Sequence, residues 1–198
     1  MKSFQRLRLT LTFGLALLLF SCSSSPKQGK IYFVPLGDFP AQLTDELAAH
    51  YKDKFNVTIE KLPSIQLDSS MVDHSRNQMV AEGLIAVMKN KFQSLESDPN
   101  VIVIGLTQED IYIRSYNWRF AFTFRQDDKF AVVSTARMDP VNFGDPADEN
   151  LLRTRLRKMV TKNIGILYYQ KPLSENPRSV LYSNVGGIEE LDAMGEDF

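Results

Sequence analysis

The chain has 198 residues, 43% of them hydrophobic, which is enough material for one domain with a real core. Lysine and arginine total 23 against 24 aspartate and glutamate residues, and this near-balance argues against a nucleic-acid-binding surface. Cys22 is the single cysteine, which excludes an internal disulfide and a metal site built from several thiolates.

The N-terminus has the pattern of a secretory signal. Three basic residues come first: Lys2, Arg6 and Arg8. The apolar segment 9–20 follows, and at about twelve residues it is too short to cross a bilayer core. It runs into Leu19-Phe20-Ser21-Cys22, which resembles the lipobox of bacterial lipoproteins. That resemblance implies cleavage of a signal peptide, residues 1–21, and lipid on Cys22, with several acyl chains holding the protein to a membrane. An ordinary secreted chain with a stray cysteine is the alternative.

After the lipid-bearing residue the chain divides into a tether and one domain. Residues 22–29 are polar and small and form the tether, and the domain spans residues 30–198. Without the three basic residues of the leader, 20 basic residues remain against 24 acidic ones, a formal charge of about −4. No acidic stretch follows Cys22 to suggest export to the surface. We therefore expect a domain that faces the periplasm of a bacterial envelope.

The first half of the domain predicts alternating strands and helices. The apolar or alternating runs predict strands at 30–36, 56–62 and 101–105. Helical periodicity predicts helices at 39–55 and 73–95. The strand at 101–105 is apolar on both faces, so it belongs in the middle of a covered sheet.

The second half predicts two further strands and a long final helix. In the segment 118–124, Phe120, Phe122 and Phe124 alternate, which predicts a strand with the three rings on one face. A second strand is expected at 130–137. The last helix has Asp145 as its expected N-cap and Pro146 at its first position. Its apolar positions continue at helical spacing to residue 167.

Several short motifs in these elements resemble the archaemetzincin family of zinc peptidases. They are Arg76-Asn77-Gln78, the segment 105–112 (GLTQEDIY), the segment 132–137 (VVSTAR), Ser183-Asn184 and Leu191-Asp192. The matches cover about two thirds of the mature domain, so together they are much stronger than any one of them. The resemblance implies a metzincin-like α/β fold and, in the family, a zinc site on the last helix.

That zinc motif is degenerate here. The family carries H-E-x-x-H followed by G-x-x-H, and this chain has Lys162, Asn163, Ile166 and Pro172 at the first histidine, the glutamate, and the second and third histidines. A protonated lysine has no lone pair for a metal, and an asparagine amide cannot serve as a general base. The family's second, cysteine-based zinc site is also missing, with Leu173 and the segment 177–181 in its place. We therefore expect no metal, no other cofactor and no catalytic residue.

Other candidate residues have plainer interpretations. His50 lies on the first helix and is expected to be solvated. His74, with Asp68 and Asp73, invites a metal site, but capping and turn roles for this group are favoured. No nucleophile-elbow motif supports a serine hydrolase. The final helix is basic, and a solvated charged face is favoured over contact with anionic headgroups or an acidic partner; the residues are Arg153, Arg155, Arg157, Lys158 and Lys162.

The segment 118–124 is the main functional candidate. In metzincins the corresponding strand lies at the sheet edge above the cleft and pairs with extended substrate. Retained geometry would let this strand hold a peptide by main-chain hydrogen bonds without cleaving it, with Trp118, Phe120, Phe122 and Phe124 as its residues. The favoured alternative is that the phenylalanines simply face the core, and the two interpretations are compatible.

We therefore predict an α/β fold with a mixed, twisted sheet of about five strands, two long helices on its concave side, and a short C-terminal subdomain. The predicted function is that of a catalytically inactive, archaemetzincin-like envelope lipoprotein. Its expected partners are a membrane, through lipid on Cys22, and a peptide or protein in the former substrate groove, with no nucleic acid. The rivals are a metal-dependent peptidase that uses unrecognised ligands and a purely structural envelope component.

Overall fold

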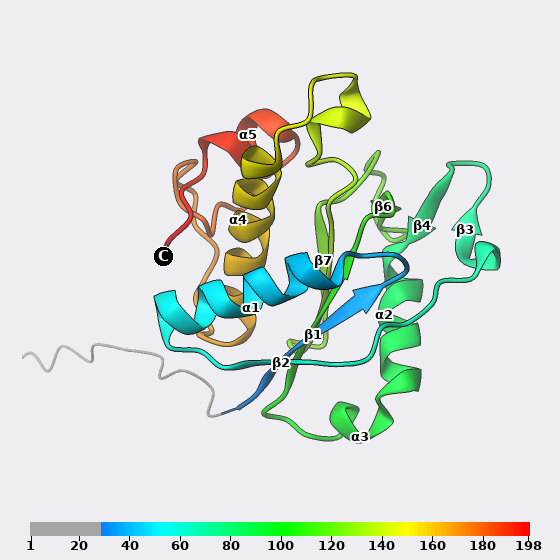
Figure 1. The fold of residues 1–198 in the computed structure, drawn as a ribbon, viewed down its shortest axis with the longest axis vertical. Helices are drawn as coiled ribbons and strands as arrows, with labels where there is room; N and C mark the ends of the chain where they lie inside the picture. The colour runs from blue at the N-terminus through cyan, green and yellow to red at the C-terminus, as the bar shows by residue number, and fades with distance from the viewer. Residues whose placement is uncertain (1–28) are drawn as a thin grey trace, which may run out of the picture.

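The computed structural model describes residues 29–198, and its centre is a five-stranded sheet in the order β2-β1-β5-β8-β7 (Figure 1). The strands are β1 (Ile31–Leu36), β2 (Ile59–Lys61), β5 (Ile102–Thr107), β7 (Thr123–Gln126) and β8 (Phe130–Ser134). The pairs β1–β2, β1–β5 and β5–β8 are parallel, whereas β7 is antiparallel to β8. The predicted mixed sheet of five strands is confirmed.

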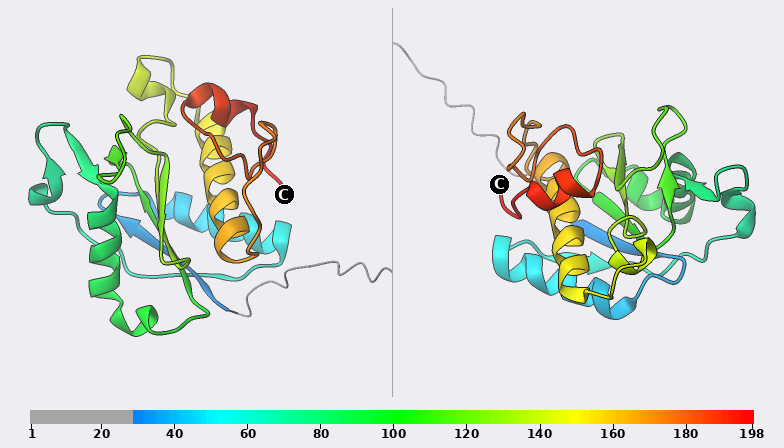
Figure 2. Two further views of the ribbon diagram at one scale, coloured as in Figure 1. Left: turned by 180° about the vertical axis from the view of Figure 1, so that it is seen from behind. Right: turned by 90° about the horizontal axis from the view of Figure 1, so that it is seen from above.

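Helices cover both faces of this sheet, which is why its central strands are apolar on both sides. On one face lie α1 (Ala41–Phe55) and α4 (Glu149–Leu167), and on the other lie α2 (Ala81–Lys91) and α3 (Gln93–Glu96) (Figure 2). Two hydrophobic clusters follow from this arrangement, one with Leu47 and Leu156 and one with Leu84 and Met88. The two longest helices, α1 and α4, therefore pack on one face of the sheet, while α2, which comes from the segment with the longest predicted helical pattern, packs on the opposite face.

The helix predicted at 73–95 is shorter and begins later. Residues before it form a second sheet of three strands in the order β3-β4-β6, with β3 at Val72–Asp73, β4 at Gln78–Val80 and β6 at Ile111–Tyr112. The carboxylate of Asp73 accepts hydrogen bonds from the backbone and hydroxyl of Ser75, and Asn77 has a left-handed φ of 53°. These features turn the chain back on itself, so the helical pattern takes effect only from residue 81.

The strand predicted at 118–124 is also displaced. β7 begins at Thr123, and Ala121 forms a single bridge with Ile111 instead. Ala121 N donates to Ile111 O at 2.8 Å, while Phe122 O accepts from Ser134 N at 2.9 Å. The chain therefore changes pairing partner between residues 121 and 122, which breaks the two-residue alternation. As a result Phe120 and Phe122 pack in the cluster beside α4, whereas Phe124 packs in the cluster beside α2.

The final helix starts later than its sequence suggested. Its N-cap is Asp148, whose carboxylate accepts from Leu151 N at 2.9 Å, and not Asp145. A 3-10 turn, η2 (Pro140–Phe143), precedes it, as a shorter one, η1 (Ser69–Met71), precedes β3.

The C-terminal segment then runs along α4 and includes α5 (Ile188–Ala193) (Figure 1). Between residues 29 and 198, no helix is both long and apolar enough to cross a bilayer. The predicted signal peptide and the lipid site at Cys22 lie outside the described residues.

Candidate functional site

The degenerate motif positions lie in and after the last turns of α4. Lys162 and Asn163 are 4% and 0% exposed, Ile166 is partly buried, and Pro172 is exposed beyond the helix end. Nowhere in residues 29–198 do three or more His, Cys, Asp or Glu side chains gather closely enough to hold a metal ion. Lysine, asparagine, isoleucine and proline side chains do not form a zinc donor set, so the residues present here do not fit the family's zinc ion.

Asn163 ties α4 to the edge strand β7. Its Nδ2 donates to Thr123 Oγ1 at 2.9 Å and to Met159 O at 2.7 Å, and its Oδ1 accepts from Arg125 Nη1 at 3.2 Å. The amide thus serves as donor and acceptor at once, which a carboxylate at this position could not do. The position that carries the general base in the family therefore holds a structural link in this chain.

Lys162 and Arg125 place two positive charges beside this link. Lys162 Nζ donates to the carbonyl of Tyr182, and burial, together with the charge of Arg125, lowers the pKa of Lys162 to about 8. Burial also lowers the pKa of Arg125. No carboxylate forms an ion pair with either side chain within the described part of the chain. The site therefore carries uncompensated positive charge.

The outer edge of β7 has main-chain groups that form no hydrogen bond with any residue from 29 to 198. Phe122 O accepts from Ser134 N, and the register continues as Thr123 opposite Val133 and Phe124 opposite Val132. Hydrogen-bonded and non-hydrogen-bonded pairs alternate in an antiparallel ladder, so the N–H and C=O groups of Thr123 and Arg125 point away from β8. Because β7 is the last strand of the sheet, these groups are available to an added strand.

The four aromatic residues predicted for the edge strand lie in different environments. Phe122 is 4% exposed and belongs to the core, and Phe124 is also packed, so the core interpretation holds for both. Trp118 is 55% exposed and stacks on Tyr116 with a centroid separation of 4.6 Å. Only Phe124 lies within β7 itself. The outward-facing edge groups belong to Thr123 and Arg125, which the aromatic periodicity of the segment does not indicate.

The two histidines, His50 and His74, take no part in the sites described above. His50 is partly exposed, but its Nε2 is buried with no hydrogen-bond partner in residues 29–198, so the side chain is less solvated than expected. His74 is exposed. The turn and capping roles belong to its neighbours, since Asp73 accepts from Ser75 and Asp68 accepts from Ser70 N at 2.7 Å.

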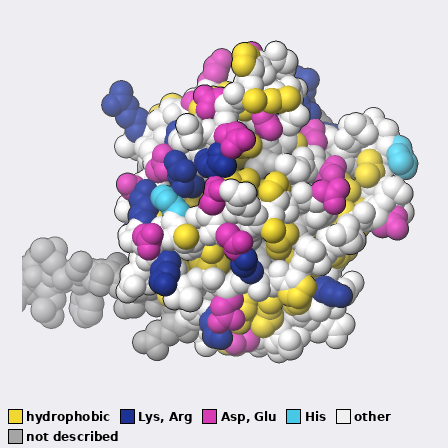
Figure 3. All heavy atoms as spheres, viewed as in Figure 1, with side chains coloured by type: hydrophobic (Ala, Val, Ile, Leu, Met, Phe, Trp, Pro, Cys, Tyr) yellow, Lys and Arg dark blue, Asp and Glu magenta, His cyan; other side chains and the backbone are white. Residues whose placement is uncertain are grey.

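The basic face of α4 is not solvated as expected. Arg155, Lys158 and Lys162 are 7%, 6% and 4% exposed, because the C-terminal segment covers this side of the helix. Arginines of α4 pair with carboxylates of other elements, as in Arg153 with Glu46, Arg155 with Asp192 and Arg157 with Glu196. On the face of the molecule seen in Figure 3, side chains of both charge signs are interspersed.

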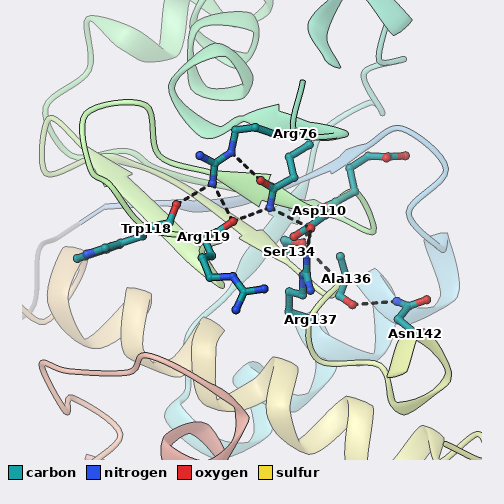
Figure 4. A network of polar contacts seen from close by, with 10 residues as sticks. Arg76, Asp110, Trp118, Arg119, Ser134, Ala136, Arg137 and Asn142 are labelled. Carbon is teal, nitrogen blue, oxygen red and sulfur yellow. Dashed lines mark hydrogen bonds and ion pairs between the residues drawn. The ribbon is translucent and has the colours of Figure 1, made fainter. Parts of the chain in front are cut away.

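A second polar cluster contains Arg76, Asp110 and Arg137 (Figure 4). Gln78 of β4 joins Arg76 to Asp110 by hydrogen bonds. Gln78 Oε1 accepts from Arg76 Nε at 2.9 Å, and Gln78 Nε2 donates to Asp110 Oδ2 at 3.0 Å. The same carboxylate oxygen accepts two hydrogen bonds from Arg137, at 3.0 and 2.6 Å. The sequence motifs contain Arg76, Gln78, Asp110 and Arg137, but nothing in their spacing indicated that they meet.

Comparison with known proteins shows that this chain is similar to archaemetzincins. The chain is 31% identical over 144 residues to the archaemetzincin of Methanocaldococcus jannaschii, a match that covers 69% of this chain and 70% of that protein. It is 29% identical over 135 residues to the archaemetzincin of Haloquadratum walsbyi, covering 67% and 74% of the two chains. No family model matches the chain.

Solved structures agree with these relatives at the level of the fold. The archaemetzincin of Archaeoglobus fulgidus, crystallised with malonate, superposes with a TM-score of 0.66 at 23% identity, covering 85% of this chain and 94% of that one. A zinc-dependent peptidase from Methanocorpusculum labreanum gives a TM-score of 0.69 at 19% identity, with coverage of 85% and 95%. The resemblance predicted from the sequence motifs is confirmed.

Proposed function

Because the chain belongs to the archaemetzincin family but has lysine, asparagine and isoleucine in place of that family's zinc-binding motif, we propose that it binds peptides without cleaving them. The bound segment would be extended and would add a strand to the open edge of β7. The protein would be held to a bacterial envelope membrane by lipid on Cys22 and would face the periplasm.

The observation that carries this proposal is the direction of the β7 main chain. The free N–H and C=O groups of Thr123 and Arg125 face away from β8, while both side chains contact Asn163 on α4. A strand paired with β7 would therefore lie beside the former zinc position and beside the charges of Arg125 and Lys162. This charge favours a bound segment with an acidic side chain near Arg125.

The same side chains lack the chemistry of hydrolysis. Asn163 has no useful basicity near neutral pH, and its amide is already engaged by Thr123, Arg125 and Met159. Lys162 Nζ already donates a hydrogen bond to the carbonyl of Tyr182. A peptide bond at this site would meet hydrogen-bond donors but no activated water.

Peptide binding is tested with octapeptides selected from a random display library on the purified protein. Thr123→Pro removes one outward N–H, which an edge strand tolerates, and should weaken binding of the selected peptides by about tenfold in calorimetry. Thr123→Ala is the matched control, since it loses the same hydroxyl but keeps the N–H. Enrichment of no peptide, or equal affinity of Thr123→Pro and Thr123→Ala, would contradict the proposal.

The principal rival is an active metallopeptidase, because the M. labreanum neighbour is described as a zinc-dependent peptidase. Inductively coupled plasma spectrometry of protein purified with zinc in the buffer separates the two. We expect less than about 0.1 zinc per chain, since no donor set replaces the lost ligands. Stoichiometric zinc together with chelator-sensitive peptide hydrolysis would establish the rival. A purely structural component would show neither zinc nor peptide binding.

A further inference from the structure

A pocket of about 510 Å³ opens just before the edge strand begins, and three of the side chains that line it are arginines. The lining residues come from β4 and its preceding turn, the approach to β7, the segment after β8, and η2: Arg76, Gln78, Arg119, Phe120, Arg137 and Phe143. None of these residues contributes to the β7 edge or to the former zinc position. The pocket is therefore a separate feature of the molecule.

Two of the arginines are held in place by buried partners. Gln78, only 5% exposed, accepts from Arg76 Nε, while Arg76 Nη2 donates to the carbonyls of Trp118 and Arg119 at 2.8 and 2.9 Å (Figure 4). The Arg76 guanidinium also lies over the ring of Tyr112, 4.2 Å from its centroid. Arg137 is fixed by Asp110 and lies over Phe120, 5.2 Å from the ring centroid. A fixed guanidinium loses little conformational entropy when it binds a ligand.

The pocket has a surplus of positive charge. Three guanidinium groups line the pocket, and two carboxylates of the described residues lie near them: Asp110, which pairs with Arg137, and Asp73, which is close enough to interact with the charge of Arg76. The arginines therefore outnumber the carboxylates. Asp110 Oδ1 is buried without a hydrogen-bond partner in residues 29–198, so the carboxylate lies beneath the pocket and does not line it.

Several donors in the pocket remain free. Among residues 29–198, the hydrogen bonds of Arg76 and Arg137 use Nε and Nη2, and Nη1 of each side chain has no partner there. Arg119 is exposed, and its side chain has no partner in the described part of the chain. Its guanidinium is therefore the one most open to a ligand.

We propose that this arginine pocket binds a doubly charged oxyanion, either a phosphate group or a dicarboxylate. Three arginines in one pocket suit such a group, because guanidinium forks pair with the oxygens of phosphates and carboxylates through charge-assisted hydrogen bonds. Phe120 and Phe143 provide apolar walls, which suits a ligand whose charged end is attached to a carbon skeleton. The inference does not depend on peptide pairing with β7.

The test is a titration of the mature chain in detergent with inorganic phosphate, methyl phosphate, succinate and acetate. Trp118, the only tryptophan of the chain, precedes Arg119 and accepts from Arg76 through its carbonyl, so its fluorescence reports on the pocket. We expect a saturable change with phosphate and methyl phosphate, with succinate, or with both, and a much weaker one with acetate. Comparison of the affinities for phosphate and for succinate shows whether the pocket prefers a phosphate group or a dicarboxylate.

Variants connect the signal to the pocket. Arg119→Gln should weaken binding by about tenfold, because it removes charge-assisted hydrogen bonds, and Arg119→Lys should recover part of the loss. Arg178→Gln is the matched control, an exposed arginine on the C-terminal segment, and should bind as wild type does. Arg119→Gln leaves no buried partner unpaired, and an unchanged melting temperature verifies its fold. The proposal is overturned if no dianion gives a saturable signal, or if Arg119→Gln and Arg178→Gln bind equally well.

Discussion

Asn163 on α4 donates its amide to the hydroxyl of Thr123 on β7 at 2.9 Å, and this contact joins the end of the last long helix to the edge of the sheet. The same amide accepts from Arg125. In the archaemetzincin family this helix position carries a catalytic glutamate, whereas here it positions the strand proposed to receive a peptide. The same side chain that replaces the catalytic glutamate therefore also holds the edge strand in position.

Replacement of this side chain should be costly. Asn163→Ala leaves Arg125 without its acceptor and Thr123 without its donor at a site that is 0% exposed. We expect a loss of about 2–4 kcal/mol in the free energy of unfolding, measured by urea denaturation. Asn142→Ala serves as control, since Asn142 makes a single side-chain bond to Ala136 O and should cost about 1 kcal/mol. If both variants lost the same free energy of unfolding, the contacts of Asn163 with β7 would not stabilise the fold more than one ordinary hydrogen bond does.

Lys162 should lower the stability of the folded protein. Its pKa falls from an ordinary 10.5 to about 8, so the folded state binds the proton less well than the unfolded state does. The full cost, on the order of 3 kcal/mol, is present below pH 8 and is relieved as the pH rises toward 10.5. Lys162→Met should therefore be more stable than wild type at pH 7, by about 1–3 kcal/mol.

The pH dependence distinguishes this cause from a packing effect. Wild-type stability relative to Lys162→Met should rise between pH 8 and 10.5, as the folded state loses a proton that the unfolded state keeps. Lys52→Met, at an exposed position of α1, should show no such difference from wild type. A constant gap between wild type and Lys162→Met across this pH range would contradict the assignment.

If lipid is attached at Cys22, the mass of the mature protein should show it. Mature wild-type protein should begin at Cys22 and should carry the mass of its acyl chains in intact mass spectrometry. Cys22→Ser should carry none, whereas Ser24→Ala should keep the full modification. Detection of an unmodified thiol at Cys22 in protein from envelope membranes would refute the anchor, since several acyl chains are needed for firm attachment.

Much of the sheet could be predicted because its strands are buried on both faces. β1 and β5 are continuous apolar runs, and helices α1 and α4 show regular apolar spacing. The segment 73–80 was misassigned because Met79 and Val80 continue the apolar pattern of α2, although Asp73 and Asn77 turn the chain there. Local turn chemistry outweighed periodicity at that point.

The site was less predictable than the fold, for a physical reason. Arg125 and Asn163 are 38 positions apart, and their contact depends on how α4 lies against β7. The burial of Lys162 likewise depends on the C-terminal segment, whose Tyr182 carbonyl covers it. A charged helix residue is solvated by default, so a sequence alone gives no sign that a distant segment removes it from water.

That C-terminal segment is held by Arg155 and Asp192, which form hydrogen bonds of 2.8 and 2.7 Å. Arg155 lowers the pKa of Asp192, so the pair stabilises the folded state above the ordinary carboxylate pKa, and this contribution is lost as the pH falls through the lowered value. Asp192→Asn should cost about 1–2 kcal/mol at pH 7, less than a fully buried pair because the Asp192 side chain is 40% exposed. Glu149→Gln, which breaks the exposed pair with Arg153, should cost under about 0.5 kcal/mol. If both variants lose the same stability in urea, or if the Asp192→Asn deficit does not shrink at all as the pH is lowered, the pair does not hold the segment in place.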